Sequence, residues 1–424
     1  MDRPASGGEV SLKLLPSPIT DRLAQLAALG ATEHGIDRRL FSAADAAARR
    51  LFVQWARAAK YAVEQDRAGN VFARRAGRRD GAAAVLSGSH LDTVPTGGPY
   101  DGAYGAVAAL CALEELDANG IVTEHPVEAV AWAGEEGSRF PLGCLGSGAF
   151  AGLNDLATID ALCDDDGVIF AGARAATDGL LADVPVRDGF PVPAGYVELH
   201  IEQGPVLEHR GVRLGVVTAI AGQVRLAVEV YGESGHAGTV PMNLRRDALS
   251  SAAELVLELE AAAKEIGEAV LTVGHLTVFP NQTNVIPGRV LLRVDARSVD
   301  EARLSALRDA IVSGAARVAE QRGVRIETSV IEQRRAVAMD PQLRAAVAEA
   351  IAELGEPAIE LPSGAGHDAM CVAAVAPAAM LFVPSVGGRS HVGNEYTAPE
   401  DLQLGVAALT RSIAAIDRLL SKER

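Results

Sequence analysis

Several imidazole and carboxylate side chains of this 424-residue chain follow short apolar segments, where ligand sites often form. Five of them have the chemistry of metal ligands: His90, Asp101, Glu136, His200 and His391. Mixed histidine and carboxylate sets suit Zn²⁺, and they also suit Mn²⁺ and Co²⁺ because no soft thiolate is required. Since a carboxylate can bridge two ions about 3.5–4 Å apart, the five residues predict a site for two divalent metal ions that activates water.

No single one of these residues identifies a metal site, because a lone histidine or aspartate in a loop is usually a surface group or a cap. The paired acids Glu135 and Glu136 would ordinarily be solvated as well. Here, however, they follow Val130–Ala133 directly, where a buried strand is expected to meet a turn. The combination of residues, rather than any one of them, therefore favours the metal site.

The elements that must position these residues alternate between strand and helix in the first half of the chain. Strand character is found in 70–74, 85–87, 127–133 and 197–201, and helical character in 51–60 and 102–118. This order predicts an α/β fold with a mainly parallel sheet and helices on both faces. The ligands would then converge beyond the carboxyl ends of the strands, at one edge of the sheet.

The pattern changes after Gly222. Strands are expected at 224–231, 270–279, 289–297 and 324–331, and helices at 245–264 and 300–321. The order strand, helix, strand, strand, helix, strand predicts a ferredoxin-like α+β unit inserted into the first domain. The helices 341–354 and 400–420 and the strand 378–383 would return to the first sheet. The predicted domains are therefore 1–217, 218–334 and 335–424, an arrangement that lets His391 join His90.

Composition limits the partners and the compartment. The chain has 39 basic and 55 acidic residues, a net charge of −16, which disfavours nucleic acids and anionic membranes as partners. The N-terminus, Met1–Pro4, does not resemble a signal peptide, and no apolar run approaches the roughly 20 residues of a membrane span. No CxxC motif is present, and we expect reduced, mostly buried thiols in a cytoplasmic protein at Cys111, Cys144, Cys163 and Cys371.

Six short motifs of the chain carry histidine or acidic residues: Gly88–Val94, Tyr100–Gly102, Gly134–Phe140, Glu198–Pro205, Gly235–Met242 and Ser363–Met370. They resemble motifs of the hydantoinase/carbamoylase amidases, which are aminoacylase-like di-zinc metallopeptidases. The similarity runs from about residue 66 to residue 407. The motif Glu198–Pro205 is the most specific, because peptidase relatives have an acid where His200 stands. Family members include N-carbamoyl-L-amino acid hydrolases, β-ureidopropionases and allantoate amidohydrolases.

The resemblance implies a division of the metal ligands between two ions. His90 and His200 would hold one ion, Glu136 and His391 would hold the other, and Asp101 would bridge them.

The resemblance also implies roles for two further acids near the ions. Asp92 would fix the imidazole of His90. Glu135 would be the general base, because an unligated carboxylate beside a metal can take a proton from the attacking water and return it to the leaving amine.

The resemblance further implies substrate contacts and a dimer formed through the inserted domain, which would act as a lid. His236 would stabilise the oxyanion, often in the partner's site, and Asn284 and Arg297 would bind the substrate carboxylate. Gln203 and His367 would line the pocket. Without the resemblance, the alternatives are a loop histidine for His236 and an exposed residue at a strand end for Arg297.

The sequence departs from the family pattern at several positions near the expected pocket. Gly235 stands where Asp is frequent, Val240 where Thr is common and Ser298 where His is frequent, and the motif around His391 lacks its usual Pro. Every expected metal ligand is retained, so these changes bear on the substrate.

The expected activity is therefore hydrolysis of the carbamoyl amide of an N-carbamoyl-L-amino acid, giving the amino acid, CO₂ and ammonia. Three alternatives remain open. They are hydrolysis of allantoate, cleavage of N-acyl amino acids or peptides, and binding of a small molecule without catalysis.

Overall fold

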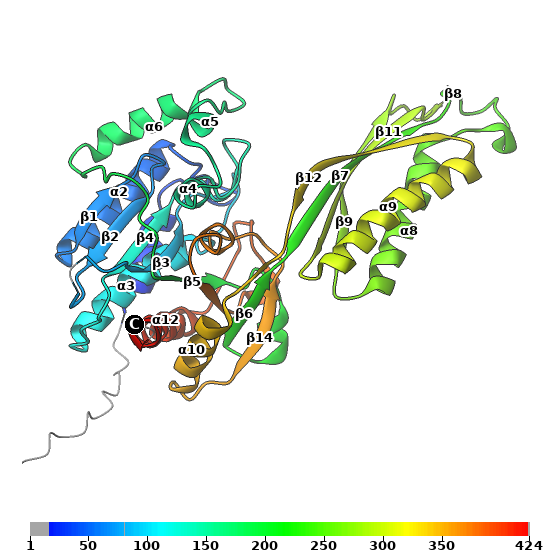
Figure 1. The fold of residues 1–424 in the computed structure, drawn as a ribbon. Helices are drawn as coiled ribbons and strands as arrows, with labels where there is room; N and C mark the ends of the chain where they lie inside the picture. The colour runs from blue at the N-terminus through cyan, green and yellow to red at the C-terminus, as the bar shows by residue number, and fades with distance from the viewer. Residues whose placement is uncertain (1–16, 80, 423–424) are drawn as a thin grey trace, which may run out of the picture. The chain divides into compact units, whose positions relative to one another are not determined.

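The computed structural model describes residues 17–79 and 81–422 of the chain, so the N-terminal segment Met1–Pro4 lies outside the described residues. The chain forms two units (Figure 1). Of the described residues, the first unit comprises 17–79, 81–218, 339–361 and 367–422, and the second comprises 219–338 and 362–366. Along the sequence, segments of the first unit therefore come both before and after the main part of the second unit.

A nine-stranded sheet forms the centre of the first unit and runs in the order β1-β2-β4-β3-β5-β15-β6-β13, with β14 paired to β6. The strands are β1 (Ala62–Gln65), β2 (Val71–Arg75), β3 (Val85–His90), β4 (Val127–Trp132), β5 (Gly195–Ile201), β6 (Leu214–Ile220), β13 (Val337–Ala338), β14 (Ala358–Ser363) and β15 (Ala378–Val383). The four central strands β4, β3, β5 and β15 are mutually parallel, as predicted. The pairs β1–β2, β2–β4, β15–β6 and β6–β13 are antiparallel, which the sequence did not predict.

Helices cover both faces of the parallel centre. The main helices are α1 (Ile19–Ala27), α2 (Ala43–Ala58), α3 (Ala103–Ala118), α10 (Pro341–Ala352) and α12 (Pro399–Lys422). Shorter helices are α4 (Leu145–Phe150), α5 (Leu156–Asp160), α6 (Phe170–Asp178), α7 (Val206–Arg210) and α11 (Ala369–Val372), with 3-10 turns η1 (Gly179–Leu181) and η3 (Val386–Gly388).

The strand β4 shows how the two faces are filled. Ala129 and Ala131 belong to the core that contains α3 and α12, whereas Trp132 packs against Phe150 of α4, with ring centroids 5.2 Å apart. Helix α3 lies very close to the sheet, because a Cβ atom added at Gly105 would lie 2.2 Å from the carbonyl oxygen of Leu199. Small residues thus allow the close helix–sheet packing that brings the amino end of α3 to the ends of the strands.

The second unit is a four-stranded antiparallel sheet with two helices. Its sheet has the order β12-β7-β11-β9. The elements are β7 (Gly222–Tyr231), β8 (Gly235–His236), η2 (Met242–Leu244), α8 (Ala248–Ile266), β9 (Val270–Phe279), β10 (Val285–Ile286), β11 (Arg289–Ser298), α9 (Glu301–Arg322) and β12 (Arg325–Arg334). Alternate residues of β7 are buried in one core with residues of α8 and α9: Val224, Leu226, Val228 and Val230. The main elements follow the ferredoxin-like order.

Candidate metal centre and substrate-binding residues

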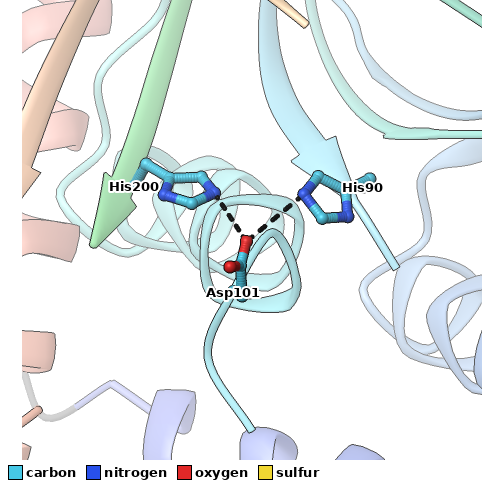
Figure 2. Close-up of side chains that lie close together, drawn as sticks. All are labelled: His90, Asp101 and His200. Carbon is cyan, nitrogen blue, oxygen red and sulfur yellow. Dashed lines mark ion pairs between the residues drawn. The ribbon is translucent and has the colours of Figure 1, made fainter. Parts of the chain in front are cut away.

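The first group of metal-ligand side chains consists of two imidazoles and one carboxylate. His90 is the last residue of β3, His200 lies near the end of β5, and Asp101 precedes α3. The oxygen Oδ1 of Asp101 lies 3.6 Å from Nε2 of His90 and 3.3 Å from Nε2 of His200. All three side chains are buried, and Figure 2 shows the carboxylate between the two rings. The parallel neighbours β3 and β5 therefore present their histidines to one acid.

A second group of ligand atoms forms on the other oxygen of the same acid. Nε2 of His391 lies 3.3 Å from Oδ2 of Asp101 and 3.5 Å from Oε2 of Glu136. The side chain of His391 is 51 % exposed, whereas that of Glu136 is 6 % exposed. Within each group the potential ligand atoms lie within 4.8 Å of one another. Asp101 thus presents one oxygen to each group, which is the arrangement of a bridging carboxylate.

The charges of these groups fit a bound cation. Burial raises the pKa of Glu136, and the neighbouring Asp101 raises it further. Hydrogen bonding to Asp101 is the main reason that the pKa of His391 is raised to about 9. In addition, Oε1 of Glu136 is buried and has no hydrogen-bond partner among the described residues. Clustered carboxylates with an unused oxygen, set among imidazoles, form a donor set that matches divalent metal ions.

A glycine beside Asp101 makes room for the first group. Gly102 has a φ angle of +61°, and a Cβ atom there would lie 2.3 Å from the ring of His90. Any larger residue would have to displace that ring. Asp101 therefore supplies a potential ligand, and Gly102 leaves the space that the ring of His90 occupies.

Asp92 contacts both His90 and the turn that carries the paired acids. Its carboxylate lies 3.8 Å from Nδ1 of His90, and its backbone oxygen lies 2.9 Å from that atom. The carboxylate also accepts hydrogen bonds from the backbone N–H groups of Gly134, Glu135 and Glu136, at 3.1, 3.2 and 3.3 Å. The side chain of Asp92 therefore holds the turn that carries the paired acids, and its main chain orients the imidazole.

Glu135 lies beside the first group of ligand atoms. Its Oε2 atom is 3.7 Å from Nε2 of His90, and its Oε1 atom accepts a hydrogen bond from Sγ of Cys144 at 3.3 Å. Burial raises the pKa of Glu135. One oxygen of Glu135 is thus held by a thiol, while the other faces the ligand cluster.

The two predicted pocket residues both contact the ligand cluster. Nε2 of Gln203 donates a hydrogen bond to Oδ2 of Asp101 at 2.7 Å, and its Oε1 atom has no partner among the described residues. The ring of His367 packs edge-on against His200, with centroids 4.5 Å apart. Burial and the neighbouring His200 lower the pKa of His367 well below its usual value, which favours a neutral ring.

In the second unit, His236 and Asn284 lie together. His236 in β8 pairs with Val285 in β10, and the backbone N–H of Ala237 donates to the carbonyl oxygen of Asn284 at 3.0 Å. Nδ1 of His236 accepts a hydrogen bond from the backbone N–H of Gly238 at 3.0 Å. A neutral His236 therefore carries its proton on Nε2, and the exposed ring can donate from that atom.

Arg297 lies at the opposite end of the same sheet. Strands β7 and β11 pair continuously from Arg289 opposite Tyr231, near β8, to Arg297 opposite Gln223. These eight steps along β11 correspond to about 27 Å. The strand register therefore separates Asn284 from Arg297 within one chain, and their joint binding of a substrate carboxylate stays a prediction.

The guanidinium of Arg297 is held in place by its neighbours. It makes two hydrogen bonds to the carboxylate of Asp295, from Nε at 2.8 Å and from Nη2 at 3.1 Å. Its Nη1 atom donates to the carbonyl oxygen of Gly364 at 2.8 Å. Because a guanidinium has five N–H donors, the remaining donors of Arg297 can still bind an anion.

Three residues near the cluster were not predicted from the sequence. Cys144 contacts Glu135, and Ser390 and Glu395 contact the carboxylate of Asp101 or its main chain. Ser390 and Glu395 belong to the motif that contains His391. Their closeness to this predicted ligand in the sequence could have indicated that they lie near the cluster. Cys144 carried no such signal, because a single cysteine in an apolar segment is normally a core residue.

Comparisons with known proteins identify the family. The sequence pattern of the peptidase family M20/M25/M40 matches residues 86–415. The chain belongs to this family. It is 40 % identical to an N-carbamoyl-L-amino-acid amidohydrolase of Paenarthrobacter aurescens over 94 % of this chain and 98 % of the relative. It is 38 % identical to an allantoate amidohydrolase of Bacillus subtilis (strain 168), covering 92 % and 95 % of the two chains.

The fold of the chain is similar to that of a solved amidase structure. A hydantoinase/carbamoylase family amidase from Burkholderia multivorans matches with a TM-score of 0.89 and 40 % identity, covering 94 % of this chain and 97 % of that one. The predicted resemblance is thus confirmed, and the chain is a hydrolase of this family. Among residues 17–79 and 81–422, no helix is long and apolar enough to cross a membrane.

Proposed function

We propose that this protein is a metal-dependent amidohydrolase that cleaves the carbamoyl amide of N-carbamoyl-L-amino acids, releasing the amino acid, CO₂ and ammonia. The observation that carries the proposal is the shared carboxylate of Asp101 between two groups of ligand atoms, with Glu135 beside them. The 40 % identity to an N-carbamoyl-L-amino-acid amidohydrolase over 94 % of the chain supports the substrate class.

The metal ligands would be divided as the geometry suggests. His90 and His200 would hold one divalent ion, Glu136 and His391 the other, and Asp101 both. Zn²⁺ suits this donor set best, and Mn²⁺ or Co²⁺ can replace it. When bound, such ions polarise the substrate carbonyl and lower the pKa of water.

Glu135 would move the proton in this reaction. Its Oε1 atom is engaged by Cys144, so Oε2, which faces His90, is the oxygen available to accept a proton from the attacking water. The same oxygen can return that proton to the leaving amine. The raised pKa of the buried Glu135 suits an acid that is protonated in one step and deprotonated in the next.

Gln203 would favour a carbamoyl group over an acyl group. Because its amide nitrogen donates to Asp101, its free Oε1 atom is fixed as a hydrogen-bond acceptor. A carbamoyl substrate offers an N–H₂ group to such an acceptor, whereas an N-acetyl substrate offers a methyl group. An acceptor left without its donor penalises the acyl substrate.

The residues of the second unit support a homodimer with composite sites. His236 and Asn284 are separated by about 27 Å of strand from Arg297, so one small substrate cannot contact both groups in one chain. In a two-fold dimer, Arg297 would bind the carboxylate in its own chain, while His236 and Asn284 would serve the partner's site. The edge strand β9, with exposed Val270, Leu276 and Phe279, is available for such a contact. The second unit would thus act as both lid and dimerisation domain, with the boundaries 218–334 expected from the sequence.

Allantoate is the second candidate substrate, because a relative at 38 % identity is an allantoate amidohydrolase. Allantoate carries ureido groups and a carboxylate, so it makes the same demands on Glu135, Gln203 and Arg297. Either reaction fits a cytoplasmic enzyme whose four cysteines are free thiols.

An ammonia-release assay tests the proposal. The protein is loaded with Zn²⁺, Mn²⁺ or Co²⁺ and offered N-carbamoyl-L-amino acids, N-carbamoyl-β-alanine, allantoate and, for amino acid release, matched N-acetyl-L-amino acids. We expect turnover of one ureido class and little turnover of the acetyl compounds. Preferred cleavage of the acetyl compounds would favour a deacylase, and binding without any turnover would favour a non-catalytic protein.

A further inference from the structure

Glu395 makes three contacts around the loop that carries Asp101. It is 4 % exposed and follows His391 by four residues. Its Oε1 atom accepts hydrogen bonds from the backbone N–H groups of Tyr100 and Asp101, at 2.8 and 3.0 Å. Its Oε2 atom lies 2.8 Å from Oγ of Ser390. Glu395 therefore ties the main chain of the loop before α3 to the segment that contains His391.

Ser390 extends this connection to the carboxylate of Asp101. Its Oγ atom lies 2.6 Å from Oδ2 of Asp101, the oxygen that also accepts the hydrogen bond from Gln203. Asp101 is thus fixed at both ends, its main chain directly by Glu395 and its carboxylate by Ser390. These contacts fix the orientation of the carboxylate plane. Without them, the two side-chain torsions of Asp101 would leave that orientation free to change.

The space around Glu395 is adapted to this contact. A Cβ atom added at Gly98 would lie 2.3 Å from the carboxyl carbon of Glu395. Gly98 has no positive φ angle that would require glycine, so the close approach of Glu395 is the steric reason for a glycine there.

We infer that Glu395 is a positioning residue of the metal centre, which turns the carboxylate of Asp101 so that each oxygen faces a different group of ligands. The inference rests on the proposed metal centre. Groups that orient metal ligands typically change metal affinity by about 10–100-fold. Because Asp101 belongs to both groups, loss of Glu395 should weaken the binding of both ions. Loss of His200 or of His391 should mainly weaken the binding of one ion.

Asp417 provides a matched control in the first unit. Its carboxylate accepts hydrogen bonds from the backbone N–H groups of Glu124 and His125, at 2.9 and 2.8 Å, and contacts Nδ1 of His125 at 2.9 Å. It therefore makes the same kinds of contact as Glu395, but none with a proposed metal ligand. Removal of either carboxylate should cost stability, and only removal of Glu395 should change metal affinity.

The test is a titration of the metal-free full-length protein with Zn²⁺ and Co²⁺, followed by calorimetry and by Co²⁺ absorption. Glu395→Ala should weaken both binding steps by about 10–100-fold. Glu395→Gln should stay close to the unmodified chain, because its amide oxygen can accept the two N–H groups and its N–H₂ group can donate to Ser390. Asp417→Ala should retain both affinities.

Three results would overturn the inference. They are unchanged affinities in Glu395→Ala, weakening of one ion alone, and an equal loss in Asp417→Ala. If Glu395→Ala does not fold, Ser390→Ala is measured instead, with the same expectation for both ions. If the unmodified chain binds no ion, the metal centre and this inference both fail. If it binds two ions but hydrolyses no ureido compound, the substrate proposal fails and the inference stands.

Discussion

Mixing two inactive variants should restore activity if the active site is shared between two chains. The variants are His236→Ala, which removes the proposed oxyanion donor, and Glu135→Gln, which removes the proposed general base. The choice of variants follows from the register of β11. About 27 Å of strand lie between Arg289, at the end near His236 and Asn284, and Arg297. A substrate whose carboxylate is held by Arg297 therefore cannot be reached by His236 of the same chain.

The expected recovery can be calculated from the symmetry of a two-fold dimer. After equal amounts of the variants exchange chains at random, about half of the dimers are mixed. Each mixed dimer has one site with both original residues and one site with neither. The mixture should therefore reach about one quarter of the activity of the unmodified protein at the same chain concentration.

The assay is ammonia release after incubation of the variants, with exchange verified by tags of different mass on the two chains. Each variant alone and a mixture cross-linked before exchange provide the baselines. If mixed dimers form and activity does not rise above those baselines, His236 does not act in the partner's site. The argument from the strand register would then be refuted, because the second unit would have to bring His236 to its own site.

Three further results are expected. The fully loaded protein should contain about two divalent ions per chain and lose activity on chelation, with recovery when metal is added back; full turnover in metal-free protein, verified by elemental analysis, would contradict the metal centre. Glu135→Gln should keep its ions but lose about 10²–10⁴ in kcat, and loss of the ions would show that the roles of Glu135 and Glu136 are reversed. Arg297→Lys should raise KM for a carboxylate substrate and lower kcat less, since it keeps the charge but not the fork; an unchanged KM would rule out Arg297 as the anchor.

The ligand residues could be predicted because their signal is local. His90 and His200 stand at or near the ends of apolar strands, and the paired acids follow such a strand directly, so strand order alone places them at one edge of the sheet. The alternation of strand and helix also predicted the parallel centre, because parallel neighbours in a sheet need a crossover connection, usually a helix, between them.

The remaining features depend on contacts that no local pattern encodes. The side chain of Asp92 was expected at His90, and its hydrogen bonds to the turn at Gly134–Glu136 become visible only when β3 and β4 are paired. Glu395 contacts a residue 294 positions earlier in the chain. Helix α2 begins at Ala43, eight residues before the predicted start, because its first turns are rich in alanine and lack apolar periodicity.

The position of β15 has a consequence for the order in which the molecule can assemble. This strand lies between β5 and β6 in the sheet, yet residues 378–383 are synthesised after the whole second unit. Until they emerge from the ribosome, the edges of β5 and β6 that pair with β15 stay unpaired. Asp101 also has no contact with His391, Ser390 or Glu395 at that stage. Nascent chains that end before Ala378 should therefore be more prone to aggregation than complete chains. Because they lack His391, such chains should bind only the Co²⁺ ion held by His90, His200 and Asp101. Absorption spectra of purified truncated and complete chains would measure this difference.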